Sequence, residues 1–407
     1  MKITTDNTPQ EKVTPLGIIP NEWKILPLQK VGKIYSGGTP DTKEPSYWNG
    51  DILWCTPSDI TKLKTRFITN TNQKITQLGL KNSSATLLPP GCILVCTRAT
   101  IGNAAITLKE TSTNQGFKNI KPIKDINVDW LFYCIASNKH RLVQLGGGST
   151  FLEVSKKDFE KFKIAIPPLP EQQKIAEIIS TWDKAIEKQS QLIEKLELRK
   201  KGLMQQLLTG KQRLPGFSDP WKVYKLGELF QERNEKNRTD LPLLSISGDH
   251  GVILQTESNK RDTSNEDKSK YKRINKGDIG YNTMRMWQGR SALSDLEGIV
   301  SPAYTIVTPN KGVDGYYMSN LFKQPRLMYD FWTHSQGLVE DTLNCKYRDF
   351  GKVRINCPSY IEQKAISKII TATDHEIELA KQKLELFRQQ KHGLMQQLLT
   401  GKKRVKL

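Results

Sequence analysis

The chain is built from an internal duplication, and this feature limits its possible folds more than any other. The decamer GLMQQLLTGK stands at Gly202–Lys211 and again, unchanged, at Gly393–Lys402, an offset of 191 residues. The same offset aligns EQQKIAEII, which starts at Glu171, with EQKAISKII, which starts at Glu362. Ten consecutive identities within one ungapped register indicate a tandem duplication, so the fold must contain two related halves.

Both copies of the repeat have the periodicity of a long helix. Apolar residues recur at alternating spacings of four and three over about five heptads, which is typical of a helix that packs along another helix. Gly210 and Gly401 stand where a C-terminal cap is expected, and a helix from Glu171 to Leu208 would extend roughly 57 Å at about 1.5 Å per residue. We therefore expect the two helices to pack against each other. The predicted seam positions are Ile175, Ile179, Trp182, Ile186, Gln189, Ile193, Leu196, Lys200, Leu203 and Leu207 in the first helix, and Ile366, Ile370, Thr373, Ile377, Ala380, Leu384, Phe387, Lys391, Leu394 and Leu398 in the second.

Two lysines, Lys200 and Lys391, interrupt the two seams at the same register. A polar residue at such a position can fix the pairing geometry of two helices at some cost in stability. Alternatively, both side chains extend into water from a frayed helix end. The sequence leaves both interpretations open.

The segments outside the helices are different in kind. Residues 15–166 and 213–357 are rich in Thr, Asn, Gly and β-branched residues, with turn signals about every ten residues. In Leu88–Thr97 and Ile274–Thr283, a turn that contains Pro or Gly leads into an apolar strand. The sequence therefore predicts an α/β domain, a helix, a second α/β domain and a second helix. Framework positions correspond in the two domains: Trp23 with Trp221, Gly91 with Gly277, Arg98 with Arg285, and Gly102 with Gly289.

With this organisation the sequence resembles the specificity subunit of a type I restriction–modification system, over nearly the whole chain. The most specific parts are IPPLPEQQKIAEIIS (Ile166–Ser180), the two copies of GLMQQLLTGK, and SGGTPDTKEPSYWNGDILWCTPSDI (Ser36–Ile60). The last of these matches a common start of that family's target-recognition domains. Duplication around two long helices is also typical of the family.

The resemblance implies an α+β fold with an internal pseudo-two-fold repeat. Two α/β target-recognition domains would alternate with two long helices that pair as an antiparallel coiled coil. The boundaries that we expect are a polar tail at 1–14, target-recognition domains at 15–166 and 213–357, a first conserved helix for spacing and partner docking at 167–212, and a second conserved helix with a basic tail at 358–407.

In function, the resemblance implies a subunit without catalytic activity of its own that reads a split, asymmetric site in double-stranded DNA. Two copies of a DNA methylation (M) subunit would dock on the helices, with restriction (R) motor–nuclease subunits added. The complex would have N6-adenine methyltransferase and ATP-dependent endonuclease activity. S-adenosylmethionine, ATP and Mg²⁺ are then expected on the partner subunits and no cofactor in this chain, and the resemblance implies the cytoplasm of a bacterium or archaeon.

Candidate DNA contacts lie in the two globular domains. Arg98 and Arg285 each follow a strand, and arginine reads guanine or clamps phosphate; a structural ion pair is the alternative. The Ser36–Pro40 loop offers backbone donors and hydroxyl groups, and with Lys43 and Tyr47 it suits phosphate positioning or base stacking. A core position is the alternative for Tyr47, and we expect Trp48 to lie in the core. The candidates are Ser36, Thr39, Lys43, Tyr47 and Arg98 in the first domain, and Ser247, His250, Lys268, Lys270, Arg285 and Arg290 in the second.

The second domain departs from the first at its opening. It has LSISGDHGV at Leu244–Val252 in place of Ser-Gly-Gly-Thr-Pro, so DNA contacts do not transfer from one domain to the other. Its polar run 256–272 is predicted to be a mobile basic loop that orders on DNA, with an ordinary solvated loop as the alternative. The cations of this region are Lys260, Arg261, Lys268, Lys270, Lys272 and Arg273.

The exposed side of GLMQQLLTGK is the candidate docking surface. Met204 and Met395 are adaptable apolar residues, and Gln205 and Gln396 are not needed for a seam. An identical surface in both copies predicts two identical partners, since the globular halves have diverged over the same period; recent duplication is the alternative. The candidates for helix pairing and docking are Trp182, Ile186, Leu203, Met204, Gln205, Leu207, Ile377, Leu394, Met395, Gln396 and Leu398.

Composition narrows the classes of partner. Lys and Arg number 62 against 42 Asp and Glu, and the net charge of +20 suits a polyanion, most simply nucleic acid. The terminal GKKRVKL adds cations that either follow phosphate or solubilise the end. The sequence has no apolar run long enough for a membrane helix, we expect no secretory signal, and its six scattered cysteines are predicted to be reduced core thiols.

Motifs for catalysis are missing from the sequence. It has no Asp/Asn-Pro-Pro-aromatic motif of an amino-methyltransferase and no P-loop, and its five histidines are dispersed. The nearest approach to a Mg²⁺ cluster, Asp249 with Glu266 and Lys268, has no counterpart in the first half. Two further classes remain open: an RNA or single-strand binder, and a coiled-coil scaffold without nucleic acid.

Overall fold

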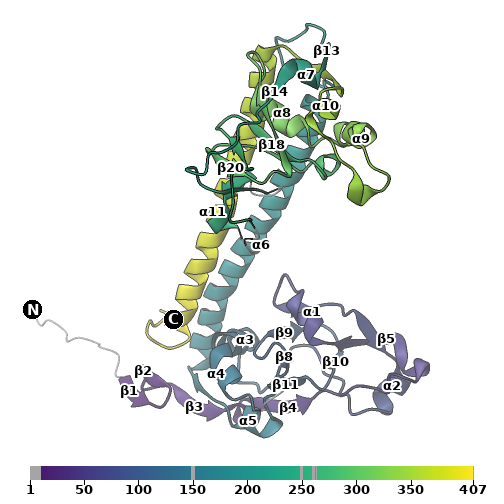
Figure 1. Ribbon diagram of the computed structural model, residues 1–407. Helices are drawn as coiled ribbons and strands as arrows, with labels where there is room; N and C mark the ends of the chain where they lie inside the picture. The colour runs from purple at the N-terminus through teal and green to yellow at the C-terminus, as the bar shows by residue number, and fades with distance from the viewer. Residues whose placement is uncertain (1–10, 148–151, 248–250, 259–261, 263, 407) are drawn as a thin grey trace, which may run out of the picture. The chain divides into compact units, whose positions relative to one another are not determined.

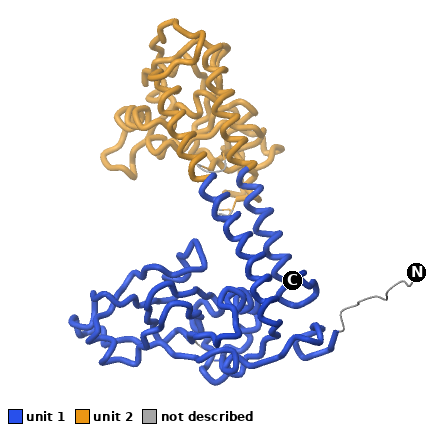
Figure 2. The backbone as a smooth tube through the Cα atoms, turned by 180° about the vertical axis from the view of Figure 1, so that it is seen from behind, with its two compact units in different colours: residues 1–192, 380–407 blue, residues 193–379 orange. Residues whose placement is uncertain are grey.

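The computed structural model describes residues 11–147, 152–247, 251–258, 262 and 264–406. The chain divides into two compact units: unit 1 comprises residues 1–192 and 380–407, and unit 2 comprises residues 193–379 (Figure 2). Two helices of 39 residues each, α6 (Leu169–Leu207) and α11 (Tyr360–Leu398), contribute to both units. Each unit therefore combines one globular domain with the start of one helix and the end of the other.

The globular domain of unit 1 is organised around a five-stranded sheet (Figure 1). Its order is β4 (Gly32–Ser36), β11 (Phe117–Pro122), β8 (Ile93–Cys96), β9 (Ala104–Thr107) and β6 (Phe67–Ile68), and only the β6–β9 pair is parallel. A second sheet has the order β10 (Thr111–Thr113), β5 (Trp48–Cys55) and β7 (Gln73–Ile75). Two strand pairs complete the unit: β1 (Glu11–Thr14) with β2 (Gly17–Pro20), and β12 (Lys163–Ile166) with β3 (Lys24–Pro27). Glu11–Thr14, which we expected in a polar tail, thus form a strand.

The central strand β8 explains the apolar run that the sequence shows there. Ile93 and Val95 face the main core, whereas Leu94 and Cys96 face a smaller cluster on the opposite side of the sheet. A strand covered on both faces needs apolar residues at every position. The helices of the domain are α1 (Pro57–Thr61), α2 (Gln77–Lys81), α3 (Val128–Ser137), α4 (Lys139–Gln144) and α5 (Lys156–Lys161), with 3-10 turns η1 (Leu28–Lys30) and η2 (Pro45–Tyr47).

Unit 2 repeats the centre of this arrangement with four strands. The order is β14 (Phe230–Glu232), β21 (Tyr304–Pro309), β18 (Ile279–Asn282) and β19 (Ser291–Leu293), all antiparallel. The pairs are β13 (Lys222–Lys225) with β22 (Arg354–Cys357), β15 (Leu244–Ser247) with β16 (Gly251–Leu254), and β17 (Lys272–Ile274) with β20 (Gly298–Val300). The helices are α7 (Leu226–Leu229), α8 (Gly315–Leu321), α9 (Pro325–His334) and α10 (Tyr347–Phe350), with turns η3 (Gln255–Glu257), η4 (Met286–Gln288) and η5 (Glu340–Thr342).

The framework correspondences predicted from sequence recur in three dimensions. Gly91 and Gly277 have φ angles of 80° and 92° ahead of β8 and β18, and Gly102 and Gly289 have φ angles of 83° and 72° after them. A positive φ is tolerated by glycine because it has no Cβ. The same turns therefore frame the same strand in two domains that otherwise have diverged.

Each main core joins its domain to both long helices. In unit 1, Trp23 and Trp130 pack with Ile175 from α6 and with Leu398 and the adjacent Leu399 from the end of α11. In unit 2, an aromatic group around Phe350 packs with Leu207 and Leu208 from the end of α6 and with Ile366 from α11. Neither domain has a complete core without residues from both repeats.

The helices run antiparallel where they meet inside each unit. In unit 1, Trp182 contacts Phe387 edge to face at 5.6 Å, while Gln189, further along α6, donates to the carbonyl of Ala380, which is earlier on α11. The same inverse order holds in unit 2, where Lys200 meets Asp374 and Leu207 lies near the start of α11 in the core. Every predicted seam position is buried or half-buried, which agrees with the heptad pattern.

Candidate nucleic-acid interface and helix framework

Arg98 and Arg285 lie at equivalent places, just beyond β8 and β18. In unit 1 the N–H of Val154 donates to the carbonyl of Thr97 at 3.0 Å, and in unit 2 the N–H of Cys345 donates to the carbonyl of Thr283 at 2.8 Å. Val154 and Cys345 are related by the 191-residue offset of the repeat. The same backbone contact therefore fixes the segment beside each arginine.

Both arginines are in ion pairs. Arg98 Nη2 lies 2.6 Å from Glu153 Oε2, and Arg285 Nη2 lies 3.1 Å from Asp341 Oδ1. The arginine side chains remain 46% and 38% exposed, so a surface ligand can still reach them. The ion-pair alternative is thus present in the structure, and DNA contact by these residues stays a prediction.

The Ser36–Pro40 loop is packed more tightly than we expected. The N–H groups of Gly37 and Gly38 donate to the carbonyls of Phe117 and Thr113, and a Cβ at Gly37 would come within 1.9 Å of the carbonyl oxygen of Asn114. The expected free backbone donors are therefore already used, and the glycines are required by close packing. Thr39 Oγ1 donates to Gln115 Oε1, and Ser36 is half-buried at the end of β4.

The aromatic residues that follow this loop are partly structural. Trp48 contacts Trp54 edge to face at 5.0 Å and donates from Nε1 to the carbonyl of Asp41. Trp48 is half-buried against a small cluster around Trp54, so the core position that we expected for it is only partly realised. Tyr47 is half-buried and Lys43 is exposed, so of these two Lys43 is the more accessible to a ligand.

The C-terminal end of the polar run 256–272 in the second domain is not a mobile loop but the start of a strand. Lys272 and Arg273 belong to β17, and burial lowers the pKa of Lys272. Arg273 pairs with Glu235 at 3.0 Å and with Glu297 at 2.5 Å. The expectation that these two cations lie in a mobile loop was wrong, because neighbouring strands hold them.

The remaining candidates of the second domain differ in exposure. Lys270 and Arg290 are exposed, Ser247 is half-buried at the end of β15, and Lys268 donates from Nζ to the carbonyl of Asn265 at 3.2 Å. His250, Asp249, Lys260 and Arg261 lie outside the described residues. Of the described candidates, Arg285 and Arg290 lie side by side, since the N–H of Arg290 donates to the carbonyl of Arg285 at 3.4 Å.

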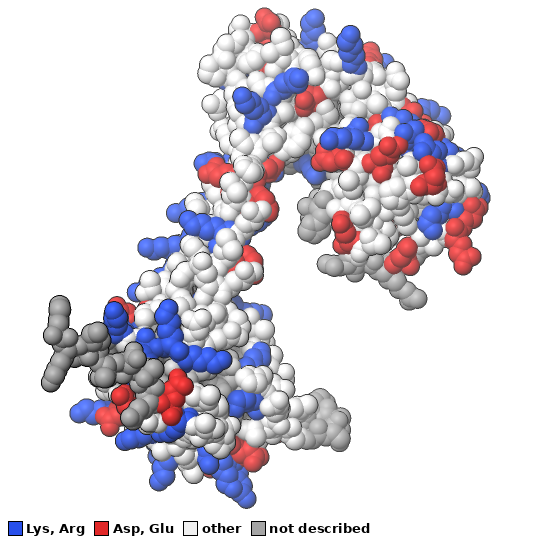
Figure 3. All heavy atoms as spheres, turned by 90° about the vertical axis from the view of Figure 1, so that its left-hand side faces the viewer, with Lys and Arg blue, Asp and Glu red and all other residues white. Residues whose placement is uncertain are grey.

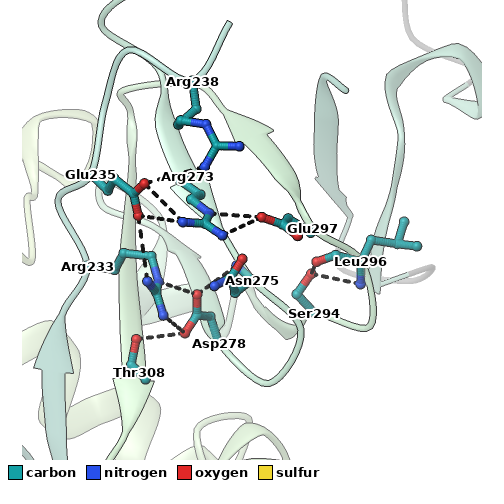
Figure 4. A network of polar contacts seen from close by, with 10 residues as sticks. All are labelled: Arg233, Glu235, Arg238, Arg273, Asn275, Asp278, Ser294, Leu296, Glu297 and Thr308. Carbon is teal, nitrogen blue, oxygen red and sulfur yellow. Dashed lines mark hydrogen bonds and ion pairs between the residues drawn. The ribbon is translucent and has the colours of Figure 1, made fainter. Parts of the chain in front are cut away.

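A buried carboxylate organises a network that sequence reasoning missed (Figure 4). Asp278 is 1% exposed and accepts from Arg233 Nε at 2.7 Å, from the N–H of Asn275 at 2.7 Å and from Thr308 Oγ1 at 2.7 Å. Glu235 joins this cluster to Arg273. On the face of unit 2 seen in Figure 3, acidic and basic side chains are interleaved, so much of its positive charge is locally compensated.

The helix ends form the same junction twice. In unit 1, buried Glu171 accepts from Trp23 Nε1 at 3.0 Å and from Arg404 Nε at 2.6 Å; in unit 2, buried Glu362 accepts from Trp221 Nε1 at 3.3 Å and from Arg213 Nε at 2.6 Å. All three members are related by the repeat. The expectation that the basic C-terminal tail only follows phosphate or solubilises the end was wrong for Arg404, which closes unit 1.

A glutamine next to each glutamate ties the helix start to the domain. Gln172 accepts from the N–H of Asn127 at 2.9 Å, and Gln363 accepts from the N–H of Asp314 at 2.9 Å. Asn127 and Asp314 are the N-caps of α3 and α8. The Glu-Gln pair of each repeat therefore orients the domain helix on the long helix.

The two seam lysines pair with aspartates of the facing helix. Lys391 Nζ lies 2.5 Å from Asp183, which also accepts from Tyr133; Lys200 Nζ lies 2.5 Å from Asp374, which also accepts from Tyr316. Burial, followed by the hydrogen bond to the aspartate, raises the pKa of Tyr316 to about 12. The pairing interpretation of the lysines is supported, and neither lysine lies at a frayed end.

The decamer GLMQQLLTGK is largely explained by packing. Leu207 and Leu398 are buried, and Leu203, Met204, Leu394 and Met395 pack partly against the cores. Gly210 and Gly401 have φ angles of 71° and 75°, and a Cβ would come within 3.2 Å of Trp221 at Gly210 and within 2.4 Å of Pro20 at Gly401. Within the decamers, the glutamine pairs and the threonine remain exposed: Gln205, Gln206 and Thr209, and Gln396, Gln397 and Thr400.

The two units differ beside the helices in a way that the sequence did not indicate. In unit 1, Arg66 ahead of β6 pairs with Asp129 at 2.8 Å and with Asp183 at 3.4 Å. The described part of unit 2 has no strand corresponding to β6. An open cavity of about 590 Å³ lies between the start of α8 and α11, lined by Asp314, Tyr316, Lys364, Ser367, Lys368, Thr371, Ala372 and His375.

The cysteines lie in the hydrophobic clusters of the two units. The six cysteines, all within the described ranges, are buried and unpaired, as the core-thiol interpretation predicts, and burial raises the pKa of Cys92 to about 11 and of Cys357 to about 12. No group of three or more His, Cys, Asp or Glu side chains in the described ranges is arranged to hold a metal ion. Among the same residues no helix is both long and apolar enough to cross a membrane.

Comparison with known families gives one consistent match. The sequence profile of the type I restriction modification DNA specificity domain matches residues 20–198 and 218–387. The chain is 36% identical over 192 residues to the type I restriction enzyme MjaIX specificity subunit of Methanocaldococcus jannaschii, covering 46% of this chain and 44% of that protein. It is 31% identical over 189 residues to the EcoR124I/EcoR124II specificity subunit of Escherichia coli, covering 44% and 45%. The matched part thus spans less than half the length of each of these relatives.

Solved structures show the same fold over nearly the entire chain. The S subunit of a type I restriction–modification system from M. genitalium aligns over 100% of this chain and 99% of its own, with a TM-score of 0.54 and 12% identity. The HsdS subunit from Thermoanaerobacter tengcongensis aligns over 94% and 98%, with a TM-score of 0.51 and 16% identity. The alternation of two α/β domains with two long helices is the fold that these structures share with it.

Proposed function

Because the chain belongs to the type I restriction–modification specificity-subunit family, we propose that it reads a bipartite, asymmetric site in double-stranded DNA and carries the subunits that act on it. Each globular domain reads one half of the site. The chain performs no chemistry itself and leaves methylation, ATP hydrolysis and cleavage to its partners.

One observation carries this proposal: the same framework occurs twice, with identical helix ends and divergent domain surfaces. The Trp–Glu–Arg junction is the same in both units, whereas the domain openings differ between Ser36–Pro40 and Leu244–Val252. Two domains on one framework with different surfaces are suited to reading two different base sequences. The long helices would then set the spacing between the two half-sites, as dimer geometry does in other DNA-binding proteins.

The charge of the chain supports a nucleic-acid partner. A surplus of twenty cations attracts the phosphate backbone without regard to sequence. Much of the positive charge on the face of unit 2 seen in Figure 3 is compensated, so exposed cations such as Lys43, Lys270, Arg290 and the two partly exposed arginines Arg98 and Arg285 are the proposed contacts.

We also propose that the exposed glutamine pairs are docking points for two copies of one methylation subunit. The buried part of each decamer is needed for packing, but Gln205 with Gln206 and Gln396 with Gln397 face solvent in both copies. Packing alone gives no reason for solvent-facing residues to stay identical while the domains diverge. Motor–nuclease subunits would join this complex through the methylation subunits or the helices.

The test is to express the chain with the methylation subunit of its system and to map N6-methyladenine in the host DNA. We expect a split motif with a fixed gap. Replacing residues 213–357 with the second domain of another family member should change one half of the motif and leave the other half and the gap unchanged. A continuous motif, or a change in both halves, would contradict the proposal, and salt-dependent binding without preference for duplex would indicate a single-strand or RNA binder instead.

A further inference from the structure

We propose that Glu153 and Asp341 compete with DNA for Arg98 and Arg285, so that each domain keeps its exposed arginine paired until a matching duplex displaces the carboxylate. The two acids would then set how strongly the protein discriminates its site from other DNA. This inference rests on the proposed function, because it assumes that the two arginines face the duplex.

In unit 1 the backbone holds the carboxylate beside the arginine. Arg98 and Glu153 form an antiparallel bridge, and the next residue, Val154, donates from its N–H to the carbonyl of Thr97 at 3.0 Å. Glu153 Oε2 then lies 2.6 Å from Arg98 Nη2. The other carboxylate oxygen lies 3.9 Å from Nζ of buried Lys118.

In unit 2 the carboxylate reaches the equivalent arginine from a different position. Asp341 lies in η5, within a loop whose ends pair through Gln336 and Asn344. Under the repeat offset, Glu153 corresponds to Asn344, so Asp341 is not its counterpart. In the two divergent domains, an acid from a non-equivalent sequence position thus pairs with the equivalent arginine. Inheritance of a framework residue does not explain this coincidence, whereas a shared functional requirement does.

The chemistry of the pair matches that of a DNA contact. Arginine binds carboxylate and phosphate oxygens through the same kind of N–H group, so the two ligands compete for the Nη2 edge that the acid occupies. The pairs are exposed to water, where an ion pair adds little to stability and exchanges readily. A duplex without the recognised bases offers only phosphate against the carboxylate, while a matching site adds contacts that favour the exchange. Breaking the ion pair costs free energy, and DNA without the recognised bases offsets less of this cost than a matching site does. The pair therefore increases specificity.

The decisive variant is Asp341→Asn, tested in the complex of the full chain with its methylation subunit. Asp341 is 86% exposed, so the amide should not affect folding. Dissociation constants are measured across a range of salt concentrations on a duplex with the mapped methylation site and on a scrambled duplex. We expect scrambled DNA to bind about three- to fivefold more tightly and the mapped site to gain less than about twofold, as suits an exposed pair. The salt dependence of binding to scrambled DNA should become steeper by about 0.9, because the freed arginine adds one phosphate contact.

Two matched controls remove the same charge elsewhere in each unit. Asp330→Asn breaks the Arg326–Asp330 pair and Glu160→Gln breaks the Lys156–Glu160 pair, both between helix neighbours. Glu153→Gln should repeat the Asp341→Asn result in unit 1. Its thermal unfolding is measured alongside, since Glu153 also faces Lys118.

The outcomes separate the inference from the function on which it rests. Unchanged or weaker binding of scrambled DNA by Asp341→Asn overturns the inference, as does a gain equal to that of Asp330→Asn. An equal gain on both duplexes also overturns it, because the acid would then not affect specificity. If the wild-type complex binds neither duplex, the proposed function fails and the inference fails with it.

Discussion

At the scale of single residues, the most informative side chains are two buried glutamates. Glu171 and Glu362 are 1% and 2% exposed, and each is satisfied by a tryptophan N–H and an arginine from the far end of the other repeat. A buried carboxylate is costly unless it is paired and hydrogen-bonded. The two glutamates therefore specify which helix end packs against the start of the other helix in each unit.

Replacing Arg404 with Met should destabilise unit 1 because Glu171 would remain buried without a cation. We expect the free energy of unfolding to fall by about 1–3 kcal/mol, less than the roughly 3–5 kcal/mol for a fully buried pair, since Arg404 is 29% exposed. Chemical denaturation measures the loss. Lys402→Met, an exposed neighbour, should change stability by less than about 0.5 kcal/mol. Equal effects of the two variants would mean that the junction does not stabilise the unit.

At the scale of the helices, pairing is fixed by polar contacts within an apolar seam. The triads Tyr133–Asp183–Lys391 and Tyr316–Asp374–Lys200 each join both helices and one domain. The tyrosines come from different positions of α3 and α8, since Tyr133 is the sixth residue of α3 and Tyr316 the second of α8. The Asp–Lys pair is thus the same in both units, whereas the tyrosine that donates to the aspartate comes from a different helix position in each domain.

A double-mutant cycle on Asp183→Asn and Lys391→Met should reveal a coupling of about 1–2 kcal/mol, because both side chains are about three-quarters buried. Equilibrium unfolding of the wild type, the single variants and the double variant provides the four values. The exposed pair Lys174–Glu177, three residues apart on α6, serves as the comparison and should couple by no more than about 0.5 kcal/mol. If the Asp183–Lys391 coupling is equally small, the ion pair does not fix the pairing of the helices, and the apolar seam residues alone determine it.

At the scale of the whole molecule, the duplication creates two equivalent sets of identical, solvent-facing residues within the repeated decamers. If these sets are docking points, their number sets the stoichiometry of the complex. The fold does not depend on them, so they can be changed without loss of either core.

Changing Gln205 and Gln206 to Glu should reduce the number of bound methylation subunits from two to one. Carboxylates buried in a docking surface without a cationic partner oppose association. Native mass spectrometry of the co-expressed complex measures the stoichiometry, and the same change at Gln396 and Gln397 should give the complementary single-site complex. Gln389→Glu with Gln390→Glu, also exposed on α11, is the matched control. Two bound subunits in the Gln205/Gln206 variant would place docking elsewhere.

The sequence by itself determined the duplication, the two long helices, their seam and the α/β character of both domains, because these depend on patterns along the chain. Periodicity and identity at a fixed offset are local properties that need no knowledge of distant contacts. They also located Arg98 and Arg285 as equivalent residues. Only the tertiary structure decided what each of these residues touches.

The partners that matter are far apart in the chain: Arg404 pairs with Glu171, and Lys391 with Asp183. No local pattern distinguishes such a carboxylate from one in water, since the pairing depends on which chain ends the fold brings together. For the same reason the sequence presented Gly37 and Gly38 as open donors and Arg273 as mobile, whereas neighbouring strands had already engaged them. Sequence patterns thus determine the architecture of this specificity subunit. Contacts between residues far apart in the chain decide which charged side chains remain available to a partner.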